Sequence, residues 1–191
     1  FIMGRKYTPG GAPVLAYVVF GKSGFARASF STNMFSALVG LRINGAGAAS
    51  TVAYDVIVSG AGDVNGDGVS DIVVGAYLST IISPARNYGG ASHVIFGRNI
   101  PDGRPHFSDI DLASFETNPV DGFGIIGAGT SDQSGVSVGT AGDINGDNLA
   151  DILVGSALAD VTVGATRMDA GIVYVVFGKF VAVGDLATNV D

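Results

Sequence analysis

The stretch AGDVNGDGVSDIVVGA, residues 61–76, places three aspartates and one asparagine within nine positions and follows them with an apolar run. The stretch AGDINGDNLADILVGS, residues 141–156, repeats the pattern 80 residues later. Only 14% of the chain is charged, yet six of its 17 acidic residues lie in these two clusters. Two clusters with matching flanks indicate a common structural or chemical role.

Alternate positions of each cluster carry oxygen atoms that suit a hard cation. Positions one, three, five and nine are Asp, Asn, Asp and Asp, and a backbone carbonyl is available at position seven. Ca²⁺ accepts about six to eight such oxygens, whereas zinc and copper favour Cys or His ligands, which are absent from both clusters. The sequence therefore predicts two Ca²⁺ ions. The expected ligands are Asp63, Asn65, Asp67, Val69 and Asp71 in the first cluster, and Asp143, Asn145, Asp147, Leu149 and Asp151 in the second.

Position six of each cluster calls for a left-handed backbone conformation. It is occupied by Gly68 and by Asn148, the non-Gly residue type that tolerates positive φ well. Position twelve is Val74 or Val154 instead of the Glu of an EF-hand, and strand-like runs flank the clusters. A metal-free turn rich in Asn and Asp is the alternative. Three carboxylates facing one another without a cation would, however, repel strongly.

Composition narrows the possible functions. The net charge of −7 and the pI near 4.5 disfavour nucleic-acid binding. The mean hydropathy is +0.43, yet no apolar run approaches the roughly 18 residues needed to span a membrane. His93 stands where the equivalent segments have Tyr17 and Tyr174, which indicates a packing position, and His106 has no nearby catalytic partner in the sequence. No G-x-S-x-G motif occurs either, so we expect no enzyme activity.

Internal repetition organises the chain. Phe-Gly pairs stand at 20–21, 96–97 and 177–178, each ending a short run rich in Val, Ile and Tyr. Short β-type segments punctuated by Gly, Asn and Asp predict an all-β chain. The expected divisions are a lead at 1–12, a first unit with its preceding Phe-Gly strand at 13–98, a second unit at 99–179 and the start of a further unit at 180–191.

Taken together, the Phe-Gly segments, the DxNxDGxxD loop and the trailing VVGA resemble FG-GAP repeats, the blades of the integrin α-subunit β-propeller, which also occur in tandem in long bacterial surface proteins. The resemblance implies four-stranded antiparallel blades, calcium bound in a β-hairpin loop by the Asp and Asn residues named above, and an extracellular or cell-surface location. Two features depart from the pattern: VGAY and VGSA lack the Pro often seen after Gly-Ala, and Asn148 replaces Gly.

A closed propeller needs about four to eight blades, and this chain supplies two propeller-like blades plus terminal strands. Either neighbouring subunits complete the sheets or the missing blades lie outside this chain. In the first case terminal strands would add to a neighbour's sheet and build a head-to-tail filament, the subunit of a surface fibre or adhesive scaffold. In the second, the chain is a propeller fragment that binds a protein or glycan through residues 78–91 and 157–170.

Overall fold

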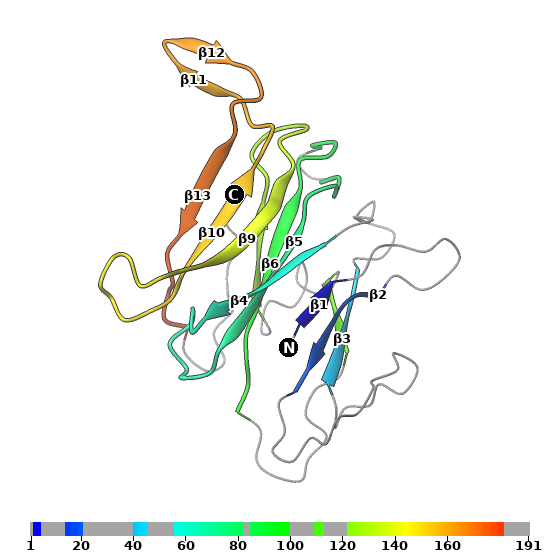
Figure 1. The fold of residues 1–191 in the computed structure, drawn as a ribbon, viewed down its shortest axis with the longest axis vertical. Helices are drawn as coiled ribbons and strands as arrows, with labels where there is room; N and C mark the ends of the chain where they lie inside the picture. The colour runs from blue at the N-terminus through cyan, green and yellow to red at the C-terminus, as the bar shows by residue number, and fades with distance from the viewer. Residues whose placement is uncertain are drawn as a thin grey trace.

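The computed structural model describes residues 2–4, 14–20, 40–45, 56–81, 85–99, 109–112 and 122–181. Across these ranges the chain consists of strands and turns and contains no α-helix. The strands form three main sheets and one small hairpin, and none of the sheets closes on itself. Figure 1 shows the sheets lying one beside the next, which confirms the predicted all-β, blade-like fold.

Each main sheet contains one of the three Phe-Gly segments. The first sheet has the order β1 (Ile2–Gly4), β2 (Val14–Val19), β3 (Gly40–Asn44) and β7 (Ile110–Asp111). The second has the order β4 (Ile57–Gly62), β5 (Asp71–Ala76), β6 (Ala91–Ile95) and β8 (Gly122–Ile126). The third has the order β9 (Ser134–Gly142), β10 (Asp151–Ser156) and β13 (Ile172–Val176). All neighbouring strands run antiparallel except β3 and β7, which are parallel.

The repeats in the sequence become equivalent strands in the structure. Strands β4, β5 and β6 of the second sheet correspond to β9, β10 and β13 of the third. The apolar runs that end in a Phe-Gly pair or follow an acidic cluster all contain strands. Strands β8 and β9 were not predicted, because β8 is rich in Gly and β9 in Gly and Ser, and the short β3 (GLRIN) was not predicted either. Strand β8 pairs with β6, so it completes the sheet of the Phe-Gly strand that precedes it. The division between residues 98 and 99 stays a prediction.

The second sheet is buried on both faces. Val74 of β5 and Ile95 of β6 pack in one apolar cluster with Ala16 and Leu41 of the first sheet. Their chain neighbours Val73 and Val94 pack in a second cluster with residues of the third sheet, such as Ile152 and Val154. Because successive side chains of a strand point to opposite faces, a sheet covered on both sides requires a continuous apolar run. This explains the uninterrupted sequence DIVVGA of β5.

Gly75 lies where the second and third sheets approach each other closely. A Cβ atom added at Gly75 would overlap the backbone carbonyl of Gly135 and touch a methyl group of Val138. A backbone atom cannot swing aside as a flexible side chain can. The absence of a side chain at Gly75 therefore sets how closely these two sheets pack.

We expect Gly75→Ala to lower the free energy of unfolding by about 2 kcal/mol, the usual cost of overpacking a closely packed interior. Gly60→Ala is the matched control, because a Cβ at Gly60 meets nothing within 4 Å. Thermal unfolding of both variants checks the prediction. Equal melting temperatures for the two variants would contradict the close approach.

Candidate metal centres

The two acidic clusters are the hairpin loops that join β4 to β5 and β9 to β10. The first carboxylate of each loop organises the backbone that follows it. Asp63 accepts hydrogen bonds from the N–H groups of Gly66, Asp67 and Gly68 at 2.8, 3.1 and 2.8 Å. Asp63 therefore winds the next five residues into a tight turn around its own side chain.

The second loop reproduces this turn. Asp143 accepts hydrogen bonds from the N–H groups of Gly146, Asp147 and Asn148 at 2.7, 3.1 and 2.9 Å. The φ angle is +83° at Gly68 and +69° at Asn148. The predicted left-handed residue at position six is thus confirmed in both loops, with Asn serving where Gly is absent.

The middle residues of each loop bond to one another. The Asn65 amide donates to Asp67 Oδ2 at 3.0 Å and its Oδ1 accepts from the Asp67 N–H at 3.1 Å. Asp67 Oδ1 in turn accepts from the Val69 N–H at 2.8 Å. Asn145, Asp147 and Leu149 make the same three bonds at 2.8, 3.1 and 2.8 Å. Each loop therefore gathers its predicted ligand residues into one compact turn.

The last aspartate of each loop is buried and ties the loop to the Phe-Gly segment. Asp71, 1% exposed, accepts from the Val64 N–H at 2.8 Å and from the Gly97 N–H at 2.7 Å. Asp151 makes the same pair of bonds with Ile144 and Gly178 at 2.8 and 2.9 Å. The sequence analysis missed these two glycines as partners of the loops. The signal was the constant occurrence of a Phe-Gly pair downstream of each acidic cluster.

The environment of Asp71 raises the pKa of its carboxyl group. Burial raises the pKa of Asp71 from its usual 3.8 to about 6, and the nearby Asp67 and Asp63 charges add to the rise. The hydrogen bonds from the Gly97 and Val64 N–H groups oppose it. An anion that costs free energy to bury is the kind of group that a bound cation would stabilise.

The donor set of the loops fits a hard cation, although the side chains are engaged with the backbone. Among the described residues, no group of three or more Asp, Glu, His or Cys side chains is arranged to hold a metal ion. The carboxylates instead accept hydrogen bonds from N–H groups of their own loop and, for Asp71 and Asp151, also from the following Phe-Gly pair. Each carboxylate oxygen can accept more than one bond, so the same oxygens remain chemically suited to Ca²⁺. The Val69 and Leu149 carbonyls stay predicted ligands.

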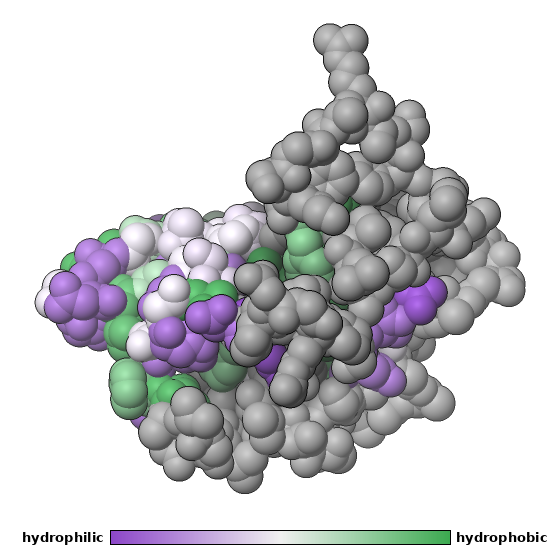
Figure 2. Space-filling view, turned by 90° about the horizontal axis from the view of Figure 1, so that it is seen from below, coloured by the Kyte–Doolittle hydropathy of each residue, from purple (hydrophilic) through white to green (hydrophobic). Residues whose placement is uncertain are grey.

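The two loops differ in what covers them. The carbonyls of Asp63, Val64 and Asn65 accept hydrogen bonds from N–H groups of the third sheet and its flanks, at 2.8, 3.0 and 3.2 Å. Val64 is 1% exposed, whereas its counterpart Ile144 is 56% exposed. The exposed loop projects at the left of Figure 1, and polar and apolar residues lie side by side on the same flank in Figure 2.

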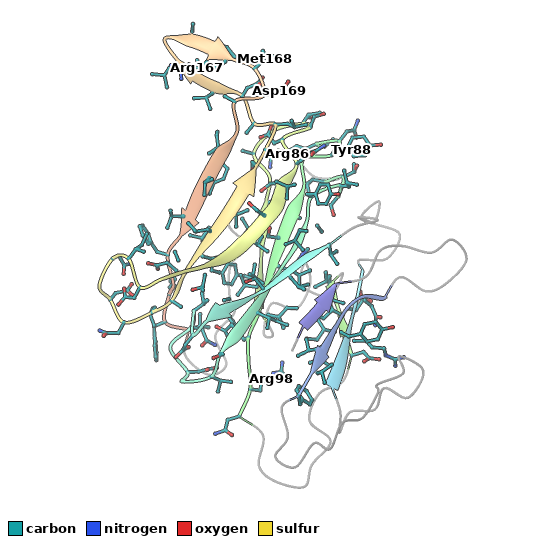
Figure 3. The ribbon with its side chains drawn as sticks, viewed as in Figure 1. Arg86, Tyr88, Arg98, Arg167, Met168 and Asp169 are labelled. Carbon is teal, nitrogen blue, oxygen red and sulfur yellow. The ribbon has the colours of Figure 1, made fainter. Side chains whose placement is uncertain are left out.

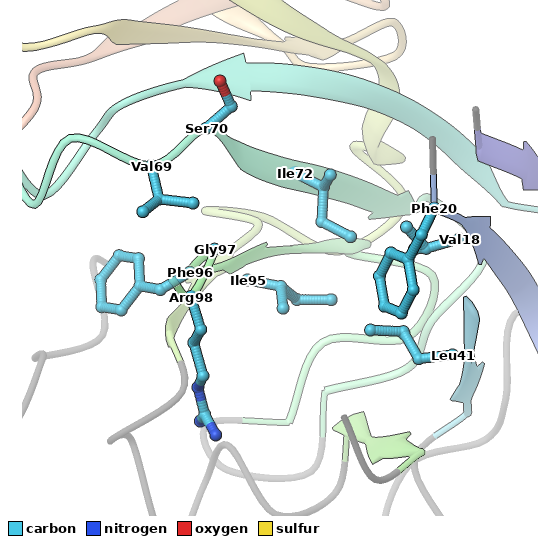
Figure 4. A pocket seen from close by; sticks show the side chains of 10 residues that line it. All are labelled: Val18, Phe20, Leu41, Val69, Ser70, Ile72, Ile95, Phe96, Gly97 and Arg98. Atoms are coloured by element: carbon cyan, nitrogen blue, oxygen red, sulfur yellow. The ribbon is translucent and has the colours of Figure 1, made fainter. Parts of the chain in front are cut away.

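An apolar cavity of about 240 Å³ lies between the first and second sheets. Figure 4 shows Val18, Phe20 and Leu41 on one side of it and Val69, Ile72, Ile95 and Phe96 on the other. The equivalent positions between the second and third sheets are occupied by residues such as Val94, Phe96, Phe123, Ile152 and Val176. These residues belong to the same apolar cluster as Val64 of the first acidic loop. The cavity is therefore the equivalent of the space that the first acidic loop fills.

The stacked sheets, the repeated loops and the buried Asp-to-Gly ties define an all-β repeat protein built from blade-like units. Residues 57–95 match the family model described as FG-GAP repeat, so the chain contains an FG-GAP repeat. This confirms the resemblance on the segment that holds β4, the first acidic loop, β5 and β6. A search of curated proteins found no match to the chain. Within the described ranges, no helix has the length and apolar character to cross a membrane.

We expect Asp71→Ala to destabilise the chain by about 2 kcal/mol in the presence of a chelator, because two buried N–H groups lose a charged acceptor. Asp67→Ala is the matched control, since Asp67 is exposed and water replaces its bond to the Val69 N–H. Denaturant unfolding at pH 7 measures both losses. Equal losses would contradict the structural role of Asp71.

The unaltered chain and the Asp71→Ala variant can also be compared at two pH values. Because the pKa of Asp71 is higher in the folded chain than its usual 3.8, the protonated carboxyl favours folding. The additional stability that comes from protonation is complete below about pH 4 and is lost as the pH rises through about 6, while the two hydrogen bonds to Asp71 remain. The destabilisation caused by Asp71→Ala is therefore larger at pH 4 than at pH 7.

Proposed function

We propose that this chain is a calcium-stabilised, extracellular structural repeat protein that assembles head-to-tail into a surface fibre or adhesive scaffold. FG-GAP repeats are a structural and binding module and typically occur in extracellular or surface proteins. The proposal assigns the chain no enzyme activity. Its partners are other copies of itself.

One observation supports the proposed head-to-tail assembly. In the second sheet, the Phe-Gly strand β6 pairs with a further strand, β8. Its counterpart in the third sheet, β13, is the last strand of that sheet among the described residues. Such an edge offers a row of N–H and C=O groups for pairing with another chain. A strand from a neighbouring copy would complete the third sheet as β8 completes the second.

Calcium would stabilise the hairpin loops. The residues that would hold it are the Asp and Asn side chains at positions one, three, five and nine and the carbonyl at position seven. When bound, the ion neutralises the carboxylates and couples metal binding to folding. The repulsion between Asp63, Asp67 and Asp71 and the unfavourable burial of Asp71, both visible in its raised pKa, are the costs that the ion would relieve.

We expect isothermal titration to find two Ca²⁺ ions per chain and a higher melting temperature in calcium than in chelator. Asp67→Ala and Asp147→Ala each remove a carboxylate from one loop, so each variant should bind one ion. Asp160→Ala is the charge-matched control, because Asp160 lies outside both loops, in the hairpin segment where it accepts from the Asp169 N–H.

The control variant should retain both ions and the full thermal shift. An identical melting curve in calcium and in excess chelator would refute the metal role of the loops while leaving the fold assignment unaffected.

The alternative function is a propeller fragment that binds a protein or glycan. It is favoured by the position of the two variable stretches, whose labelled residues lie at one end of the molecule in Figure 3. Tyr88 is 56% exposed and Met168 is 71% exposed there. Residues 157–170 also hold the hairpin of β11 (Val161–Val163) and β12 (Ala165–Arg167), which projects from the sheets.

Light scattering over a range of protein concentrations in calcium separates the two functions. A fibre subunit should grow in average mass as its concentration rises, because association is governed by mass action. A binding fragment should keep the mass of one chain throughout. A single species of 19.2 kDa at every concentration would therefore reject self-assembly.

A further inference from the structure

The chain contains three Asn-Gly pairs, at residues 44–45, 65–66 and 145–146. Asn is one of the chemically labile residue types, and a Gly after it lacks the side chain that would hinder attack on the Asn amide. The second and third pairs occupy equivalent positions in the two acidic loops and have nearly the same neighbours, VNGD and INGD. A difference in reactivity between these two pairs would therefore come from the structure around them.

The reaction is an attack of the Gly backbone nitrogen on the side-chain carbonyl carbon of the preceding Asn. A bond forms between the Gly nitrogen and Asn Cγ, the bond between Cγ and Nδ2 breaks, and ammonia leaves with the proton that the Gly nitrogen gives up. Water then opens the resulting five-membered imide at either carbonyl carbon, which yields Asp or isoaspartate. Water is the co-reactant, so no other molecule has to reach the loop.

Within each folded loop, hydrogen bonds hold the groups that would react. The Gly N–H donates to the first Asp of its loop, at 2.8 Å for Gly66 and 2.7 Å for Gly146. The side-chain oxygen of the Asn accepts from the N–H two residues on, at 3.1 Å in both loops, and its amide nitrogen donates to the Asp at that position. These bonds must break before the attack, so the rate follows the population of the locally opened loop.

The third sheet and its flanks hold the first loop closed. The backbone N–H groups of Lys179 and Val181 donate to the carbonyls of Val64 and Asn65 at 3.0 and 3.2 Å. Asn65 is 5% exposed, and a Cβ added at Gly66 would meet side chains of the third sheet's flanks at 2.9 and 3.0 Å. Opening the first loop therefore also breaks its contacts with the third sheet.

The second loop has no such cover in the part of the chain that the structure describes. Asn145 is exposed, and a Cβ added at Gly146 meets nothing within 4 Å. Among the described residues, no backbone N–H of another segment donates to the carbonyls of residues 144 and 145. The loop projects from its sheet (Figure 1), so opening it breaks bonds within the loop alone.

The remaining pair, Asn44-Gly45, lies at the end of β3. Asn44 stands opposite Val14 of β2 and Asp111 of β7, and Gly45 is buried. A strand held by neighbours on both sides opens less readily than a projecting loop. The three pairs therefore differ in their access to the open state, and Asn145 has the easiest access.

We propose that Asn145 is a site of spontaneous deamidation, and that docking of the first loop on the third sheet protects Asn65 from the same reaction. Both products add a negative charge beside Asp143 and Asp147. The isoaspartate product also adds one carbon atom to the backbone, which changes the spacing on which the turn around Asp143 depends. The modification therefore loosens the second loop and leaves the first loop intact.

The first arm of the test follows the unaltered chain at mildly alkaline pH in chelator, so that the result does not depend on the proposed Ca²⁺ ions. Peptide mass spectrometry measures the replacement of the amide by a carboxyl group at each Asn, and oxygen-18 water marks the new oxygen atom. We expect Asn145 to convert at least tenfold faster than Asn65, because the first loop must also lose its hydrogen bonds to the third sheet. In denaturant, where neither loop is folded, the two rates should become similar.

The second arm changes the equivalent residue before each Asn. Val64 is 1% exposed, so Val64→Ala weakens the anchor of the first loop and should speed the conversion of Asn65 several-fold without changing that of Asn145. Ile144→Ala is the matched control, because Ile144 is 56% exposed and its truncation should leave both rates unchanged. Each rate is divided by the rate of the same variant in denaturant, which removes the effect of the residue that precedes the Asn.

The outcomes are distinct from those that test the proposed function. Equal rates at the two residues in the folded chain, or a faster rate at Asn65, would overturn the proposal, and so would a folded chain in which neither residue converts. If Val64→Ala fails to fold, as judged by circular dichroism, the comparison of Asn65 with Asn145 in the unaltered chain decides. Selective conversion of Asn145 supports the proposal whether or not the chain binds Ca²⁺ or self-associates.

Discussion

The structure depends on one buried carboxylate in each complete unit. Asp71 and Asp151 each receive an N–H from the start of their own acidic loop and an N–H from the Gly of the following Phe-Gly pair. The same side chain therefore closes the hairpin and fixes the third strand of the sheet relative to it. A charged acceptor makes such hydrogen bonds strong, and its burial makes them costly to leave unmade. This explains why acidic loop and Phe-Gly pair occur together.

The raised pKa of Asp71 shows that this arrangement stores unfavourable electrostatic free energy. Two N–H donors only partly offset the burial of the charge, and the two other carboxylates of the loop act against it. A proton would relieve part of this repulsion, and so would the divalent cation proposed above, so the two would compete. The cost of burying Asp71 opposes the stability that its two hydrogen bonds supply.

Much of the architecture could be predicted from the sequence, because the periodic signals were strong. The 80-residue spacing of the acidic clusters and the apolar strands next to them identified the repeat, and the position of Asn148 identified its left-handed turn. Strands β8 and β9 were harder, since their Gly and Ser residues carry little hydrophobic pattern. The roles of Gly97 and Gly178 could not be predicted, because both residues act through a backbone N–H group, which every residue type except Pro has.

The loops at the two ends of the sheets obey different constraints. The acidic loops have the same length in both units. Along each loop, Asp carboxylates accept hydrogen bonds from backbone N–H groups. At the opposite end, the connections from β5 to β6 and from β10 to β13 have nearly the same length, 14 and 15 residues, but different structures. The first holds an antiparallel bridge between Ile81 and Arg86, and the second holds the hairpin of β11 and β12. The register of β10 with β13 is nevertheless unbroken from Ile152 to Ser156. The molecule therefore has one end where the connection between two strands can change its structure while the frame that carries it stays the same.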